Sequence, residues 1–269
     1  PEVLIEQWKL YLIVACTSLT STSEQRLHIP ANYSHGKKKS QQLLTIQHST
    51  ITSARSVFKL TLNLLNGYNQ AVRDAIITGL SCMNINIFRT FIECVEPIFA
   101  QWEQELGKQI HSDDSKLRIE VTHVLNIVSR FMEEDVIAQE EWIVDKLVSF
   151  IKIIKSFLSQ SEVQHSFEFQ KLRRYFCGLL ENVYNGIQKT GNSGKWLPFE
   201  ARVACFTYLE EWCGYGKYSA ISKQRYAQMS KHVTNSQEHA ALNSAIEFER
   251  QILSIAATNA MVALLNGKI

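Results

Sequence analysis

The chain of 269 residues has few of the residues that interrupt regular structure, with only 4 prolines and 11 glycines. An all-β protein needs turn residues at short, regular intervals along the chain. No segment shows a sustained alternation of apolar and polar residues, which is the pattern of a half-buried strand. These two absences exclude a β-rich fold, and the sequence predicts an all-α protein.

The chain also lacks a strong excess of either charge. Lys and Arg number 28 against 26 for Asp and Glu, a formal net charge of +2. A nucleic-acid-binding domain is usually more basic and carries its charge on one face, so no nucleic-acid partner is predicted. The run Lys37–Lys39 lies in a polar loop and is interpreted as a solvated segment, with weak attraction to an acidic partner as the alternative.

Motifs for metal, phosphate or membrane binding are missing too. None of the six cysteines forms a C-x-x-C pair, and the eight histidines include no H-E-x-x-H. The stretch "TGNSGK" at 190–195 has two residues between its glycines where a phosphate-binding loop has four, and Trp196 follows the lysine where the loop has Ser or Thr. The apolar run Leu10–Cys16 is too short to cross a bilayer, so no transmembrane segment is predicted. We therefore expect no catalytic, metal or cofactor site, and we interpret the cysteines as buried, reduced thiols of an intracellular protein.

What is present is apolar periodicity of the helical kind. Residues 20–41 form a polar loop whose composition is compatible with disorder. The first residue is not Met, and we interpret 1–269 as a single all-helical segment of a much longer protein. Helices are predicted at 2–18, 42–66, 69–83, 86–106, 114–133, 138–159, 163–189, 198–213, 217–232 and 236–266. The first of these is apolar nearly all round, which predicts that it is buried.

Three of these helices share a pattern. "VRDAIITGL" from Val72, "LRIEVTHVL" from Leu117 and "LRRYFCGLL" from Leu172 each open with an aliphatic residue and Arg, followed by apolar residues at positions five and nine. Helix-pair repeats recur at similar intervals, because one pair cannot bury its own apolar face and must stack on a neighbour. The pattern predicts an irregular HEAT/armadillo-like solenoid, with a generic helical bundle as the alternative.

The stretch "WLPFEARVACFTYLEEWCGYG" from Trp196 to Gly216 is interpreted as a helix with its two ends. Pro198 suits the first turn, Glu200 favours the positive end of the helix dipole, and Gly214 suits a left-handed C-cap. On this interpretation Cys213 is a buried residue at the end of the helix. The alternative, a nucleophilic Cys213, requires a histidine partner that the local sequence does not supply.

A basic cluster lies around the third repeat opening. Lys171, Arg173 and Arg174 share a helix with interleaved aromatic residues, Phe167, Tyr175 and Phe176, which we expect to face the core. The three cations are predicted to line a surface that binds an acidic partner.

Two segments, 51–99 and 173–216, resemble the Furry family of giant cell-morphogenesis proteins, and its fungal branch more closely. The segments 6–20 and 249–267 are similar as well. The most specific block is "W-x-P-F-E-x-R…E-W-C-G". Its members, which we interpret as structural, are Trp196, Pro198, Phe199, Glu200, Arg202, Glu211, Trp212, Cys213 and Gly214.

The resemblance implies a non-catalytic scaffold of helical repeats. Members of this family act with NDR-class kinases and Mob coactivators in polarised growth, in fungi as the RAM network. It further implies protein partners and a cytoplasmic location enriched at the cell cortex and at sites of polarised growth. Two alternatives remain: a helical regulator of another enzyme, such as a nucleotide-exchange factor, and a solenoid that binds cargo peptides.

Overall fold

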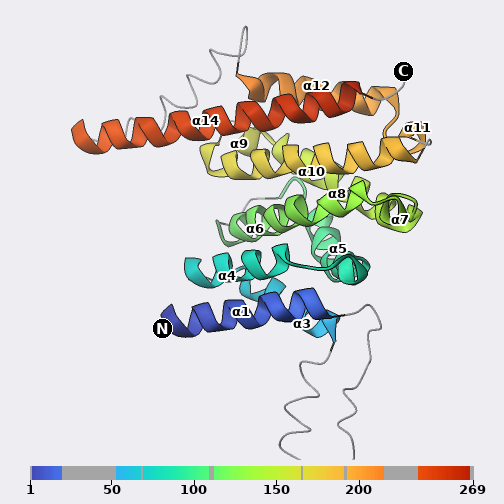
Figure 1. Cartoon of the computed structure of the whole chain (residues 1–269). Helices are drawn as coiled ribbons and strands as arrows, with labels where there is room; N and C mark the ends of the chain where they lie inside the picture. The colour runs from blue at the N-terminus through green and yellow to red at the C-terminus, as the bar shows by residue number, and fades with distance from the viewer. Residues whose placement is uncertain are drawn as a thin grey trace, which may run out of the picture. The chain divides into compact units, whose positions relative to one another are not determined.

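A computed structural model describes residues 2–19, 53–67, 69–108, 112–164, 166–190, 193–214 and 236–266. All the regular structure within these ranges is helical (Figure 1). The chain divides into two compact units, Pro1–Ile98 and Phe99–Ile269. The predicted all-α class is therefore confirmed for the described residues, while the HEAT type of the repeat stays a prediction. The predicted loop 20–41 and the predicted helix 217–232 lie outside these ranges.

The first unit is built on the contact between its first helix and a later one. Its helices are α1 (Glu2–Ser18), α3 (Ala54–Leu64), α4 (Gln70–Ser81), the 3-10 turn Ile85–Ile87 and the first part of α5 (Phe88–Gln104). Helix α1 packs along α4 at Gly79, where an added Cβ would lie 2.4 Å from Leu12 Cγ. The Asn84 side-chain amide donates to the carbonyls of Cys16, Thr17 and Leu19, so it caps the C-terminal end of α1.

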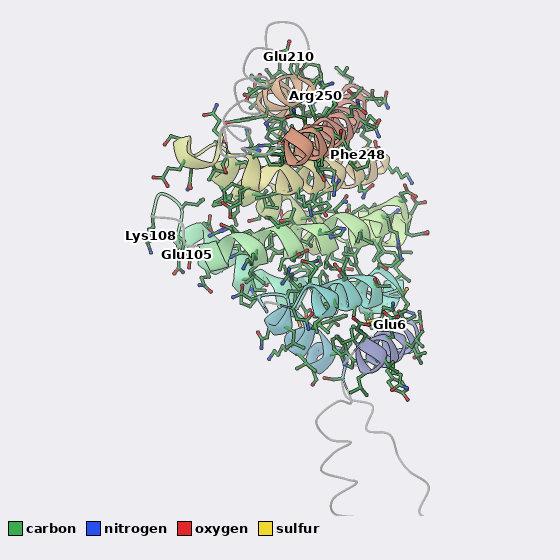
Figure 2. The ribbon with its side chains drawn as sticks, turned by 90° about the vertical axis from the view of Figure 1, so that its left-hand side faces the viewer. Glu6, Glu105, Lys108, Glu210, Phe248 and Arg250 are labelled. Carbon is green, nitrogen blue, oxygen red and sulfur yellow. The ribbon has the colours of Figure 1, made fainter. Side chains whose placement is uncertain are left out.

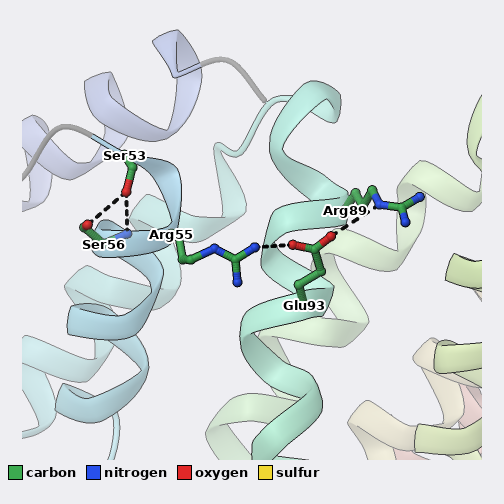
Figure 3. Close-up of polar contacts among 5 residues, drawn as sticks. All are labelled: Ser53, Arg55, Ser56, Arg89 and Glu93. Carbon is green, nitrogen blue, oxygen red and sulfur yellow. Dashed lines mark hydrogen bonds and ion pairs between the residues drawn. The ribbon is translucent and has the colours of Figure 1, made fainter. Parts of the chain in front are cut away.

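Polar contacts also fix α3 against α5 in this unit. Ser53 is the N-cap of α3, and its hydroxyl accepts from the Ser56 amide. Further along, Arg55 of α3 pairs with Glu93 of α5, and Arg89 holds the other oxygen of the same carboxylate at 3.3 Å (Figure 3). The two guanidinium groups thereby orient Glu93 between the helices.

The prediction that α1 is buried is wrong. Only Leu12 and Cys16 are buried in it, whereas the other side exposes five apolar side chains: Val3, Leu4, Leu10, Tyr11 and Val14. These five lie on one face because they recur at helical spacing. Within the described residues of its unit, α1 packs against α4 on one side, and its opposite side is exposed.

The second unit is centred on α10. Its helices are the last part of α5, α6 (Ser112–Val128), the 3-10 turn Ser129–Glu133, α7 (Asp135–Ala138), α8 (Glu141–Leu158), α9 (Ser161–Gln164), the 3-10 turn Phe167–Phe169, α10 (Gln170–Lys189), α11 (Ser193–Trp196), α12 (Phe199–Cys213) and α14 (Ser236–Leu265). Helix α10 lies between α6 and α14, as Figure 1 shows, and also packs on α8. The unit is thus a series of helical layers.

Two predicted helices are interrupted. The structure divides 138–159 at Gln139 and Glu140, and it divides 163–189 around Ser166 into α9, a 3-10 turn and α10. The second break has a physical reason, because the side chain of Arg173 binds the backbone carbonyls that the break frees. Periodicity cannot predict a short break that is stabilised by a side chain further along the chain.

The three overlaid segments lie in core helices, and their equivalence as repeats stays a prediction. Their apolar positions are all buried: Ile76 and Leu80 of α4, Val121 and Leu125 of α6, Phe176 and Leu180 of α10. Helix α14 also has an exposed apolar stripe, with Phe248 (Figure 2), Ile255 and Val262 at seven-residue intervals.

No single helix among the described residues is long and apolar enough to cross a membrane. The bent pair Gln70–Ser81 and Ile85–Gln104, with an angle of 106°, meets the length and composition test jointly.

A candidate protein-docking groove

The arginine in each overlaid segment is buried, and we call Arg73, Arg118 and Arg173 the buried arginines. Arg73 donates to the carbonyl of Gly67 and to the Gln70 side chain. Arg118 binds Glu105 at 3.0 Å and lies over the rings of Trp102 and Phe157, with its guanidinium carbon 4.8 and 4.5 Å from their centroids.

Arg173 has the most extensive set of contacts of the three. Its Nη2 donates to the carbonyls of Val163 at 2.6 Å and Gln164 at 3.0 Å, and its Nη1 donates to the carbonyl of Ser166 at 2.8 Å. The side chain is fully buried. A forked guanidinium suits this task because it carries five donors in one plane. The buried arginines thus fix helix ends and connections inside the layers.

The predicted basic surface changes in consequence. Arg173 is inaccessible, so the prediction that it contacts a partner is wrong. Arg174 is half-buried, donates to the Tyr175 hydroxyl at 3.1 Å and pairs with Glu249 of α14 at 3.5 Å. Lys171 is exposed, and its role in binding stays a prediction.

The family block forms α12 and its flanks, largely as predicted. Gly214 is the C-cap with φ 71°, in the left-handed region, and Glu200 lies in the first turn. Pro198 is the N-cap, so the helix begins one residue later than predicted, at Phe199. Trp212 is buried and meets the Phe176 ring edge-to-face at 5.9 Å.

The remaining members of the block divide between core and surface. Trp196 is buried, Phe199 is 60% exposed, and Arg202 and Glu211 are half-buried. The guanidinium of Arg202 lies 5.9 Å from the Phe199 ring. The block therefore supplies α12 with both its packing face and an exposed edge.

Cys213 is half-buried rather than buried. Its sulfur lies 3.5 Å from Thr258 Oγ1 and 3.5 Å from Met261 Sδ, both on α14. These neighbours place Cys213 in the packing between α12 and α14.

Four other thiols are buried: Cys16, Cys94, Cys177 and Cys205. Burial raises the pKa of all four thiols, and raises that of Cys16 to about 12. These four side chains are therefore neutral at physiological pH and act as small apolar residues.

The candidate site is a groove beside α8 and α11 with a volume of about 510 Å³. We call Lys146, Lys152 and Lys195 the groove lysines. Two indoles lie among them, since Lys146 Nζ is 5.7 Å from the Trp142 ring and Lys195 Nζ is 4.3 Å from the Trp196 ring. The lining residues are Trp142, Asp145, Lys146, Val148, Ser149, Lys152, Lys195 and Trp196.

This groove was not predicted from the sequence. A signal was available on α8, because Trp142, Lys146 and Ser149 are spaced by four and three residues and must share a face. Nothing in the sequence indicates that this face meets the short helix α11. Trp196 was identified as part of the family block, but its place in a groove was not.

Comparison with known proteins decides the family. The chain aligns along its whole length with the cell morphogenesis protein PAG1 of Saccharomyces cerevisiae at 44% identity. It also aligns fully with the cell polarity protein mor2 of Schizosaccharomyces pombe at 31% identity. The chain belongs to the Furry family.

Both Furry-family relatives are much longer, and the chain spans 11% of the first and 13% of the second. No family model matches the sequence. No solved structure matches it either.

Proposed function

We propose that the chain is a non-catalytic scaffold segment of a Furry-family cell-morphogenesis protein, one that docks a signalling protein for polarised growth. The observation that carries the proposal is that the whole of this chain is similar to part of a cell morphogenesis protein and to part of a cell polarity protein. The partners that the family resemblance implies are an NDR-class kinase, its Mob coactivator or another component of the RAM network. The proposed location is the cell cortex at sites of polarised growth.

The layered helices support a docking role. Layered helices present a continuous surface while their core side chains hold the layers together. The buried arginines and the buried thiols belong to that core, as described above. The groove opens beside α8 and α11 and is lined by three lysines, Asp145 and Ser149 together with the apolar side chains of Trp142, Val148 and Trp196.

The two alternatives predict different surfaces. An enzyme regulator of the exchange-factor type needs polar residues that converge on its target, and a cargo-binding solenoid needs Asn, Trp and acidic residues on successive inner helices. The groove has lysine and tryptophan from α8 and α11. This lining differs from the pattern of a cargo-binding solenoid, and its excess of lysine favours an acidic protein partner.

The test is a pull-down of the 269-residue chain against an NDR-class kinase–Mob complex at about 50 mM and about 300 mM salt. Retention of the complex that weakens at the higher salt supports the proposal, because exposed charges are screened over about 10 Å at 0.1 M. Failure to retain the complex or any other RAM component at both salt concentrations contradicts it.

A further inference from the structure

We propose that the groove beside α8 and α11 binds a short acidic segment of a partner protein, with carboxylates on the groove lysines and an apolar side chain against the two indoles. This assignment rests on the proposed scaffold function and names the chemistry of the partner. It concerns a different surface from the Lys171–Arg174 cluster that the sequence suggested.

The charges of the groove favour an anion. Its lining holds three ammonium groups and one carboxylate, that of Asp145. Lys195 also pairs with Glu141 at 3.0 Å, but the two side chains are 50% and 70% exposed. An exposed pair of this kind contributes little free energy, so a ligand carboxylate can replace Glu141 at small cost.

The two indoles of the groove determine which uncharged side chain the bound segment should carry. Trp196, the last residue of α11, is buried, and Trp142 of α8 is half-buried. Rigid aromatic surfaces of this kind bind apolar side chains with a small loss of conformational freedom. A segment that combines carboxylates with one aromatic side chain therefore matches both parts of the groove.

A nucleic acid is the other polyanion that lysine and tryptophan can bind, through stacking and backbone contacts. The net charge of the chain is only +2, whereas nucleic-acid-binding domains are usually more basic, so the charge favours a protein partner.

The experiment titrates the chain with a fluorescein-labelled peptide rich in glutamate and containing one phenylalanine. The control peptide carries glutamine at every glutamate position, and a single-stranded oligouridylate serves as the nucleic-acid probe. The double variant K146Q/K152Q removes two groove cations, and K108Q removes an exposed lysine outside the groove (Figure 2). Circular dichroism of each variant checks that the fold is retained.

We expect the acidic peptide to bind the unmodified chain and K108Q equally, and K146Q/K152Q about fivefold to tenfold more weakly, since each exposed charge contact changes an affinity a few-fold. Equal binding by the double variant, or tighter binding of oligouridylate than of the acidic peptide, overturns the assignment. If the double variant binds the peptide normally while the chain retains the kinase–Mob complex, the groove assignment fails and the scaffold function stands.

Discussion

The buried arginines and the groove lysines carry the same charge, but their surroundings differ completely. Each buried arginine donates hydrogen bonds to side chains or carbonyls of its own unit. The groove lysines lie over indoles or at the surface of an open groove. The buried arginines therefore belong to the fold and the groove lysines to the surface, and burial separates these two groups where sequence does not.

The largest effect is expected from Arg173→Leu. The substitution removes the guanidinium that donates to the carbonyls of Val163, Gln164 and Ser166, of which Val163 keeps its bond from the Ser166 amide. An unsatisfied buried polar group costs about 1–3 kcal/mol, so we expect the free energy of unfolding to fall by about 3 kcal/mol or more in a urea titration. The neighbouring Lys171→Gln, on the exposed side of the same helix, should change it by less than about 0.5 kcal/mol.

A smaller effect, without any change of charge, is expected from Gly186→Ala. A Cβ at Gly186 would lie 2.4 Å from the Met132 carbonyl oxygen, so α10 and the turn before α7 would have to separate. Overpacking of this kind costs about 1–3 kcal/mol. Gly194→Ala is the matched control, because its Cβ would meet nothing within 4 Å. Equal free energies of unfolding for the two variants would show that the contact between Gly186 and the Met132 backbone can relax to admit a methyl group.

Next in size is Gly214→Val at the end of α12. The left-handed φ of 71° is accessible to glycine and poorly accessible to a β-branched residue. We expect a loss of about 1–2 kcal/mol, seen as a lower melting temperature. Peptide binding at the groove should be unchanged, and a loss of binding would indicate that α12 positions the groove.

The smallest effect at neutral pH is expected from the buried thiols, because they make the free energy of unfolding depend on pH only in the alkaline range. Burial raises the pKa of Cys16 to about 12 from the usual 9.0. Between these two values the unfolded chain loses the Cys16 proton while the folded chain keeps it, so the free energy of unfolding falls as pH rises from 9 towards 12. Urea titrations at about pH 8 and about pH 11 should show a steeper fall for the unmodified chain than for Cys16→Ala. Equal slopes would contradict a buried, neutral thiol.

Helix positions could largely be predicted from the sequence, because local periodicity and end residues determine them. The left-handed Gly214 and the first-turn Glu200 follow from local rules. The division near Ser166 does not, because Arg173 stabilises it from the next helix. The exposed face of α1 could not be predicted from local rules either, because burial depends on which neighbours pack against a helix.

The candidate site was harder to predict. The cluster Lys171–Arg174 was visible as a run of charge, yet its central arginine is fully buried. The groove combines α8 with α11, whose nearest members, Lys152 and Lys195, are more than forty residues apart. Such a pairing depends on tertiary packing, which no local pattern in a single sequence specifies.

The most direct test of this comparison measures both unfolding and binding for two variants, Arg173→Lys and Lys152→Gln. A lysine at position 173 cannot reproduce the forked contacts, so we expect a lower free energy of unfolding and, under conditions where the variant is folded, unchanged affinity for the acidic peptide. Lys152→Gln should give the reverse, with unchanged stability and weaker binding. If Arg173→Lys unfolds like the unmodified chain, or if Lys152→Gln binds the peptide as tightly, the proposed division between fold-stabilising arginines and ligand-binding lysines is wrong.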